Sequence, residues 1–241
     1  MKSAERVLEL ADFPDEIMFK IFASLDVKDL LNCGQVAKRS RKIAHDKLLW
    51  QRTNLSGQNI SPTYIQFILD RGCKYLDLSN SSILGLNTKI TYEEVGKGDQ
   101  IFKNCAELTE LNLKNANISV RASLFLVQIL TSKLKKINLG RLYIEDPDEH
   151  IKTLVENCDQ LQEVRLQYCY PITNRAITSI IEKLKNTLET LELSLKCEKI
   201  TYSKLLELRL MEKLKILKIG RNKEMRRLKT ELQNLKINED W

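Results

Sequence analysis

A short pattern of leucine and similar apolar residues recurs along the chain from residue 73 onward. Its form is L-x-x-L-x-L, as in Leu108-Thr-Glu-Leu111-Asn-Leu113. Apolar residues that alternate with other residues predict a short strand whose apolar side chains share one face. The second apolar position of the copies, here called the anchor, is occupied by Leu76, Leu111, Ile137, Val164, Leu191, Leu217 and Leu235. The steps between anchors are 35, 26, 27, 27, 26 and 18 residues, which indicates one structural unit repeated along the chain.

The stretches between the predicted strands suit helices. Helical segments are expected at 122–130, 150–157 and 174–184. Ser61-Pro62 and Asp146-Pro147 each place a capping residue before a proline, which is a common way for a helix to begin. A strand and a helix in a unit of about 20–29 residues are typical of a leucine-rich repeat. We therefore predict an α/β repeat fold over residues 56–241, with a loop insertion near 84–99 where the step is longest. The fold would be a horseshoe of about seven repeats, with parallel strands on its concave face and helices on its convex face.

The first fifty residues carry a different pattern. Ile17, Ile21, Phe22 and Leu25 share one face of a helix. Asp26 or Asp29 is placed to cap a second helix. Apolar residues for a third helix are supplied by Ile43, Leu48, Leu49 and Trp50. We predict a short all-α unit of three helices over residues 10–55, preceded by an N-terminal segment, 1–9. A unit of this size can hardly bury its own apolar surface, which indicates a protein partner.

The six cysteines of the chain show no C-x-x-C pair and no close grouping with its two histidines. This spacing predicts no metal site, and we expect no cofactor. Cys73, Cys105, Cys158 and Cys169 fall at regular places in the repeat, so we expect them to be packing residues.

The composition, with 43% hydrophobic and 29% charged residues, excludes an intrinsically disordered chain. No apolar run approaches the roughly 18 residues of a membrane-spanning helix. The N-terminus lacks the apolar core of a secretory signal, so we expect an intracellular protein of the nucleus or cytoplasm, without a membrane partner. Most of the net charge of +7 comes from residues 203–241, which hold 11 basic and 6 acidic residues, including Arg221, Lys223, Arg226, Arg227 and Lys229. We interpret this basic segment as a solvated helical face rather than a nucleic-acid site, because acidic residues interrupt it and no aromatic residues interleave it.

The N-terminal helical segment resembles an F-box. The resemblance rests on Phe13-Pro14-Asp15-Glu16-Ile17, Ile21-Phe22, Leu25, Leu30-Leu31, Val36, Lys38-Arg39 and Leu49-Trp50. Two positions depart from the family pattern: Phe13 replaces the usual leucine, and Ser40 replaces a common tryptophan, which is expected to weaken the packing of the third helix. An F-box followed by leucine-rich repeats is similar to the substrate receptors of SCF ubiquitin ligases. The stretches LWQRTNLSGQNISP and CKYLDLSNSSI further resemble the S-phase kinase-associated branch of that family.

The resemblance implies a non-catalytic adaptor that binds the Skp-type adaptor and, through it, the cullin of an SCF complex. The positions carried over, some as contacts and some as F-box core, are Pro14, Glu16, Ile17, Ile21, Phe22, Leu25, Leu30, Leu31, Val36 and Trp50. The repeats would hold a protein substrate for ubiquitin-dependent proteasomal degradation.

Substrate contacts are expected from the outward positions of the predicted strands, because the inward positions hold the repeats together. These outward residues are Tyr75, Asp77, Glu110, Asn112, Lys136, Asn138, Glu163, Arg165, Glu192 and Lys218. Lys136 and Arg165 lie on adjacent strands, so together they could bind a phosphate or a carboxylate. The alternative is that both are solvated surface charges.

Two other classes of function compete with this interpretation. An enzyme is disfavoured because the sequence has no G-x-S-x-G, no glycine-rich phosphate loop and no H-E-x-x-H. A leucine-rich-repeat scaffold without a ubiquitin-ligase role would instead bind RNA or acidic partners through the basic C-terminal segment. Salt-sensitive binding of nucleic acid by residues 203–241 would indicate that alternative.

Overall fold

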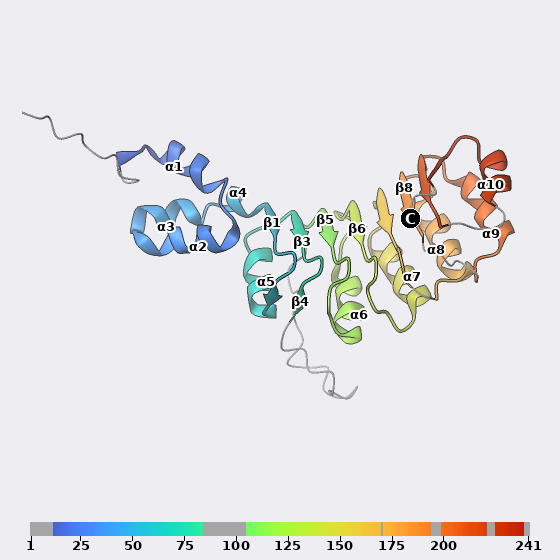
Figure 1. Ribbon diagram of the computed structural model, residues 1–241, viewed down its shortest axis with the longest axis horizontal. Coiled ribbons are helices and arrows are strands. Elements are labelled where there is room, and N and C mark those ends of the chain that lie inside the picture. The colour runs from blue at the N-terminus through green and yellow to red at the C-terminus, as the bar shows by residue number, and fades with distance from the viewer. Residues whose placement is uncertain (1–11, 84–104, 170, 194–198, 221–224, 239–241) are drawn as a thin grey trace, which may run out of the picture.

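A helical segment stands at one end of a long row of parallel strands (Figure 1). The computed structural model describes residues 12–83, 105–169, 171–193, 199–220 and 225–238. The predicted insertion near 84–99 and Cys197 lie outside the described residues. No helix in the described part of the chain is long and apolar enough to cross a membrane.

The helical segment contains two helices as predicted, whereas the residues expected in a third helix are divided between two helices, the second of which is short. Its helices are α1 (Asp15–Phe22), α2 (Val27–Val36), α3 (Lys38–Ala44) and α4 (Lys47–Trp50). Of the two candidate caps for α2, Asp26 is the one used, because its carboxylate accepts a hydrogen bond from the backbone N–H of Asp29. Helix α4 is capped in the same way by Asp46, whose carboxylate accepts from Leu48 N.

Eight parallel strands form the main sheet in the order β1-β3-β5-β6-β7-β8-β9-β10. Their bounds are β1 (Arg52–Asn54), β3 (Tyr75–Asp77), β5 (Glu110–Asn112), β6 (Lys136–Asn138), β7 (Glu163–Arg165), β8 (Thr190–Glu192), β9 (Ile216–Lys218) and β10 (Lys236–Asn238). A second, two-stranded sheet joins β2 (Asn59–Ile60) to β4 (Ser82–Ile83). Each strand of the main sheet therefore pairs with its nearest neighbour along the described chain, as a repeat fold requires.

Helices connect the strands and lie along one side of the row (Figure 1). They are α5 (Pro62–Leu69), α6 (Val120–Ile129), α7 (Pro147–Asn157), α8 (Asn174–Leu184), α9 (Tyr202–Leu206), the 3₁₀ helix η3 (Glu207–Leu210) and α10 (Met225–Glu231). The predicted caps are confirmed, since Ser61 accepts from Tyr64 N at the start of α5 and Asp146 accepts from Glu149 N at the start of α7. The sheet face opposite the helices is called the strand face below.

The repeat register expected from the sequence is confirmed over most of the sheet. Leu76 pairs with Leu111, and the pairing continues through Ile137, Val164, Leu191 and Leu217. Each of these anchors is buried between the sheet and the helices. Their burial in one column is what joins successive repeats into a continuous core.

The last anchor was predicted wrongly. Ile237, not Leu235, pairs with Leu217. The backbone N–H of Leu235 donates to the carbonyl of Leu232, so Leu235 lies in the turn that precedes the strand, as Leu108 and Leu134 do before theirs. The apolar pattern of the sequence could not reveal this shift, because Leu235 and Ile237 are both apolar.

Strand β1 was also missed by the sequence pattern. Its central residue is Thr53, which is buried and pairs with Leu76. The hydroxyl of Thr53 donates to the carbonyl of Trp50, so the polar side chain is satisfied in a position that a leucine fills elsewhere. The sheet therefore begins at Arg52, within the segment assigned to the helical unit.

The four repeat cysteines are buried, as expected of packing residues. Burial raises the pKa of Cys73 to about 11 and the pKa of Cys105, Cys158 and Cys169 to about 12. The Cys169 thiol donates to the carbonyl of Leu139 at 2.9 Å and so links adjacent repeats.

Candidate protein-binding surfaces

Helix α1 buries one side and exposes apolar residues on another. Met18 and Phe22 are buried, whereas Ile17 and Ile21 are 38% and 37% exposed. Residues four apart are neighbours on a helix surface, so Ile17 and Ile21 form a single apolar site beside the exposed Glu16. Exposed apolar neighbours of this kind are suited to binding another protein.

Two further apolar residues of the helical segment face solvent. Val36, at the end of α2, is 80% exposed, and Leu48, in α4, is 61% exposed. In the sequence Leu48 was grouped with the apolar residues Ile43, Leu49 and Trp50, but unlike them it faces solvent. The short helix α4 turns Trp50 inward, and the neighbouring Leu48 consequently points outward.

The other residues predicted to bind an adaptor divide by burial. Phe22, Leu30 and Trp50 are buried and belong to the core of the helical segment. Leu25 and Leu31 are half-buried and pack against that core. Pro14, which precedes α1, is exposed. The structure therefore distinguishes contact candidates from structural positions, which the sequence motif alone could not do.

In the basic pair Lys38-Arg39 of the motif, Arg39 has a structural role. Its guanidinium contacts the carboxylate of Asp15 at 2.7 Å and donates to the carbonyl of Phe13 at 2.6 Å. These contacts tie α3 to the start of α1. Helices α2 and α3 also approach closely, since a Cβ added at Gly34 would lie 3.3 Å from the Cβ of Ala44. Ser40 is buried on α3, so its small side chain occupies a core position rather than a surface one.

The helical segment and the first repeat meet at Trp50. The indole packs edge-on against Phe67 of α5 at 5.5 Å between ring centroids, and its N–H donates to the carbonyl of Ala44. The guanidinium of Arg71 lies over the rings of Phe67 and Trp50. This junction joins the two parts of the molecule through buried aromatic contacts.

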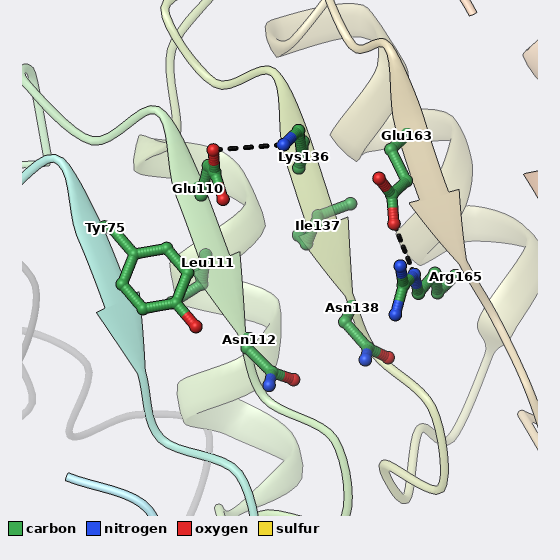
Figure 2. Close-up of a pocket in the computed structure, with 9 residues that line it drawn as sticks. All are labelled: Tyr75, Glu110, Leu111, Asn112, Lys136, Ile137, Asn138, Glu163 and Arg165. Carbon is green, nitrogen blue, oxygen red and sulfur yellow. Dashed lines mark hydrogen bonds and ion pairs between the residues drawn. The ribbon is translucent and has the colours of Figure 1, made fainter. Parts of the chain in front are cut away.

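A hollow of about 200 Å³ lies on the strand face across β3, β5, β6 and β7 (Figure 2). It is lined by Tyr75, Glu110, Leu111, Asn112, Lys136, Ile137, Asn138, Glu163 and Arg165. The structure thus brings most of the predicted outward residues together in one place.

Three outward residues of the strands were expected to have no structural role, and that expectation was wrong. The side-chain oxygens of Asp77, Asn112 and Asn138 each accept a hydrogen bond from the backbone N–H two residues further on. Such bonds stabilise the turn that follows each strand. Within these turns the fourth residue after the anchor is left-handed, with φ near 56° at Asn80 and Asn115. Asparagine tolerates this conformation better than most residues.

The two cations of the hollow already have carboxylate partners. Lys136 Nζ lies 3.2 Å from Glu110 Oε1, and Arg165 Nε contacts Glu163 (Figure 2). In the sheet register Lys136 faces Glu163, and Arg165 faces Asn138, so the two cations stand diagonally rather than side by side. The predicted anion site formed by Lys136 and Arg165 is therefore not a pair of unpaired charges.

Glu192 was expected to face a substrate, but it is only 1% exposed. Its carboxylate accepts from Gln167 Nε2, lies 2.6 Å from Lys218 Nζ and lies 3.4 Å from Arg165 Nε. A buried carboxylate needs such partners because desolvation disfavours its charge. Glu192 and Lys218 thus form a structural network next to the hollow.

The aromatic wall of the hollow is Tyr75. Its hydroxyl donates to Asp77 Oδ2 at 3.2 Å, and the guanidinium of Arg52 lies 4.5 Å from the ring centroid. Burial, followed by the charge of Asp77, raises the pKa of the phenol. Tyr75 is therefore a neutral, fixed side chain at neutral pH.

In the described part of the basic C-terminal segment, an arginine contacts both an acidic residue and an aromatic ring. Arg227 lies 3.3 Å from Glu231 and stacks on the ring of Tyr202. Arg221 and Lys223 lie outside the described residues. No group of three or more potential metal ligands occurs in the part of the chain that the structure describes.

The protein-family model described as F-box-like matches residues 10–56 of the chain. The N-terminal helical segment is an F-box-like domain. F-box domains indicate components of SCF-type ubiquitin ligases, in which they bind a Skp-type adaptor, and proteins that carry them are typically non-catalytic. The remainder of the chain is an α/β part with an eight-stranded parallel sheet and a repeat-like order of strands and helices.

Proposed function

We propose that this chain is the substrate-recognition subunit of an SCF-type, cullin-based ubiquitin ligase. The F-box-like domain would bind the Skp-type adaptor, and the strand face would bind a protein substrate for proteasomal degradation. The observation that carries the proposal is the exposure of Ile17 and Ile21 on one side of α1 within an F-box-like domain. Covering these side chains with a partner would be favourable, because apolar surface gains about 25 cal/mol per Å² on leaving water.

We further propose that the sheet and its helices are leucine-rich repeats over residues 56–241, preceded by an F-box at 10–55. The constant pairing of anchors from Leu76 to Leu217 supports this assignment. The resemblance to the S-phase kinase-associated branch belongs to the same proposal. Strand β1 would then begin the repeat sheet at the end of the F-box segment.

In this function the chain would supply proximity rather than chemistry. Holding a substrate near a ubiquitin-carrying enzyme raises the effective concentration of the substrate lysines. The raised pKa values of the buried cysteines keep those thiols protonated at neutral pH, and a protonated thiol is a poor nucleophile. Ubiquitin transfer would therefore depend on the other subunits of the ligase.

The adaptor interface is tested by replacing Ile17 and Ile21 with aspartate and measuring co-purification of the Skp-type adaptor and cullin. We expect at least about a tenfold loss of adaptor affinity, because two charges would replace the apolar contact. Phe22 is left unchanged, since it is buried and its replacement would disturb folding.

The matched control is Leu210→Asp, which places one new charge at an exposed leucine of η3 in the repeats. The control should bind the adaptor as the wild type does, and all three proteins should melt at similar temperatures. Undiminished adaptor binding by the folded double variant would exclude this interface.

A further inference from the structure

The hollow on the strand face carries balanced charge. Glu110 is paired with Lys136, and Glu163 is paired with Arg165. A phosphate group that approached either cation would also meet a carboxylate, and like charges at this distance repel. The hollow is therefore poorly suited to a phosphorylated residue, although it contains both a lysine and an arginine.

Asn138 offers a hydrogen-bond donor to the hollow. Its Oδ1 accepts from the backbone N–H of Gly140 at 3.0 Å, which fixes the orientation of the carboxamide and leaves Nδ2 turned away from that turn. Gly140 permits this contact, because a Cβ there would lie 3.1 Å from Oδ1. Among the described residues, Nδ2 of Asn138 has no hydrogen-bond partner.

Asn112, at the equivalent position of the preceding strand, is different. Its Nδ2 donates to Asp77 Oδ2 at 3.1 Å, so its donor is already used. Both asparagines accept a hydrogen bond from their own turn through Oδ1. They differ because Nδ2 of Asn112 already donates to Asp77, whereas Nδ2 of Asn138 does not donate to a described residue. Asn138 is thus distinguished by its surroundings rather than by its residue type.

Acceptors and a flat wall complete the lining. The ion pairs of Glu110 and Glu163 are both made through Oε1, so Oε2 of each carboxylate can accept a further hydrogen bond. Arg165 stands opposite Asn138 in the sheet register, and the ring of Tyr75 forms the opposite wall (Figure 2). A complementary ligand therefore carries both a donor and an acceptor, has no net charge and has a planar group.

We propose that the hollow binds a carboxamide side chain, glutamine or asparagine, from an unphosphorylated segment of the substrate. The carboxamide oxygen accepts from Asn138 Nδ2, and its NH₂ group donates to Glu163 or Glu110. This inference rests on the proposed function for its substrate, but the chemistry of the hollow is independent of the ubiquitin ligase.

The test is an NMR titration of the isotope-labelled full-length chain with two small probes, N-acetylglutaminamide and N-acetylphosphoserinamide. We expect the glutamine probe to produce saturable shifts of the Asn138 side-chain amide and the Arg165 Nε–H. The phosphoserine probe should bind the same groups at least about tenfold more weakly.

Two variants make the test specific. Asn138→Asp keeps an oxygen for the Gly140 turn but removes the donor, so it should keep the melting temperature and lose the response to the glutamine probe. Glu163→Gln removes the more exposed of the two carboxylates next to Arg165 and leaves only the buried Glu192, so it should gain binding of the phosphoserine probe. The inference is overturned if wild-type protein prefers the phosphoserine probe, if the glutamine probe shifts neither group, or if either folded variant responds as the wild type does. Adaptor co-purification is scored separately, so a failure of the proposed function would be recognised as such.

Discussion

At the scale of single residues, the surroundings of a side chain show its role where the residue type alone does not. The outward positions of the strands contain both turn-stabilising residues, such as Asp77, and residues that line the hollow, such as Tyr75. Alternation along the strand correctly predicted which side chains point away from the core. It could not predict that Glu192 would be enclosed, because that burial depends on Gln167 and Lys218 from neighbouring repeats.

His150 shows how a buried titratable side chain can influence stability. It is buried on α7, and its Nε2 lies 3.2 Å from the hydroxyl of Ser123 on α6. Burial lowers the pKa of the imidazole below its ordinary value of 6.5. The unfolded chain therefore takes up a proton more readily than the folded chain as the pH falls.

We predict that the free energy of unfolding decreases as the pH is lowered below about 6.5, the ordinary histidine pKa. Urea denaturation of wild type and His150→Gln between pH 8 and pH 5 measures this effect. The variant should lose part of the pH dependence, whereas His45→Gln, at the exposed second histidine, should retain it. Equal pH dependence in the wild type and the His150 variant would contradict the assignment.

At the scale of elements, the periodic part of the chain was predictable and its two ends were not. The anchors from Leu76 to Leu217 recur at a nearly constant spacing along the chain, except for the longer first step. The strand register could therefore be predicted from the sequence. Strand β1 has threonine at its anchor, and β10 starts after a local turn at Leu235. End repeats contact a different neighbour on one side, and tertiary contacts there replace the regular pattern.

Helices α4 and α5 form the element-level junction between the F-box-like domain and the sheet. We predict that Trp50→Ala costs about 3–5 kcal/mol of stability, because it removes a buried aromatic side chain that contacts Phe67. Hydrogen exchange should show the earliest loss of protection in α4 and α5.

Leu48→Ala is the matched control, since Leu48 lies on the same helix but is exposed. It should change stability by no more than about 0.5 kcal/mol. If both substitutions have the same small effect, Trp50 does not hold the two parts together.

At the scale of the whole molecule, the structure separates the two surfaces that are proposed to bind proteins. The exposed residues Ile17 and Ile21 lie in the F-box-like domain at one end of the molecule, and the hollow lies on the strand face (Figure 1, Figure 2). The buried junction at Trp50 connects them through packed side chains rather than through an open linker. This arrangement suits a receptor that presents a substrate at a defined position relative to its adaptor.

The central claim is that proteins bound by the repeats are ubiquitylated because the F-box-like domain recruits a ligase. The most direct measurement is quantitative mass spectrometry of proteins captured by wild type and by the Ile17→Asp, Ile21→Asp variant from cells with the proteasome inhibited. We predict that both forms capture the same proteins, and that only the wild type yields them with increased ubiquitin modification. Equal modification of the captured proteins in the wild type and in a variant that no longer binds the adaptor would contradict the claim.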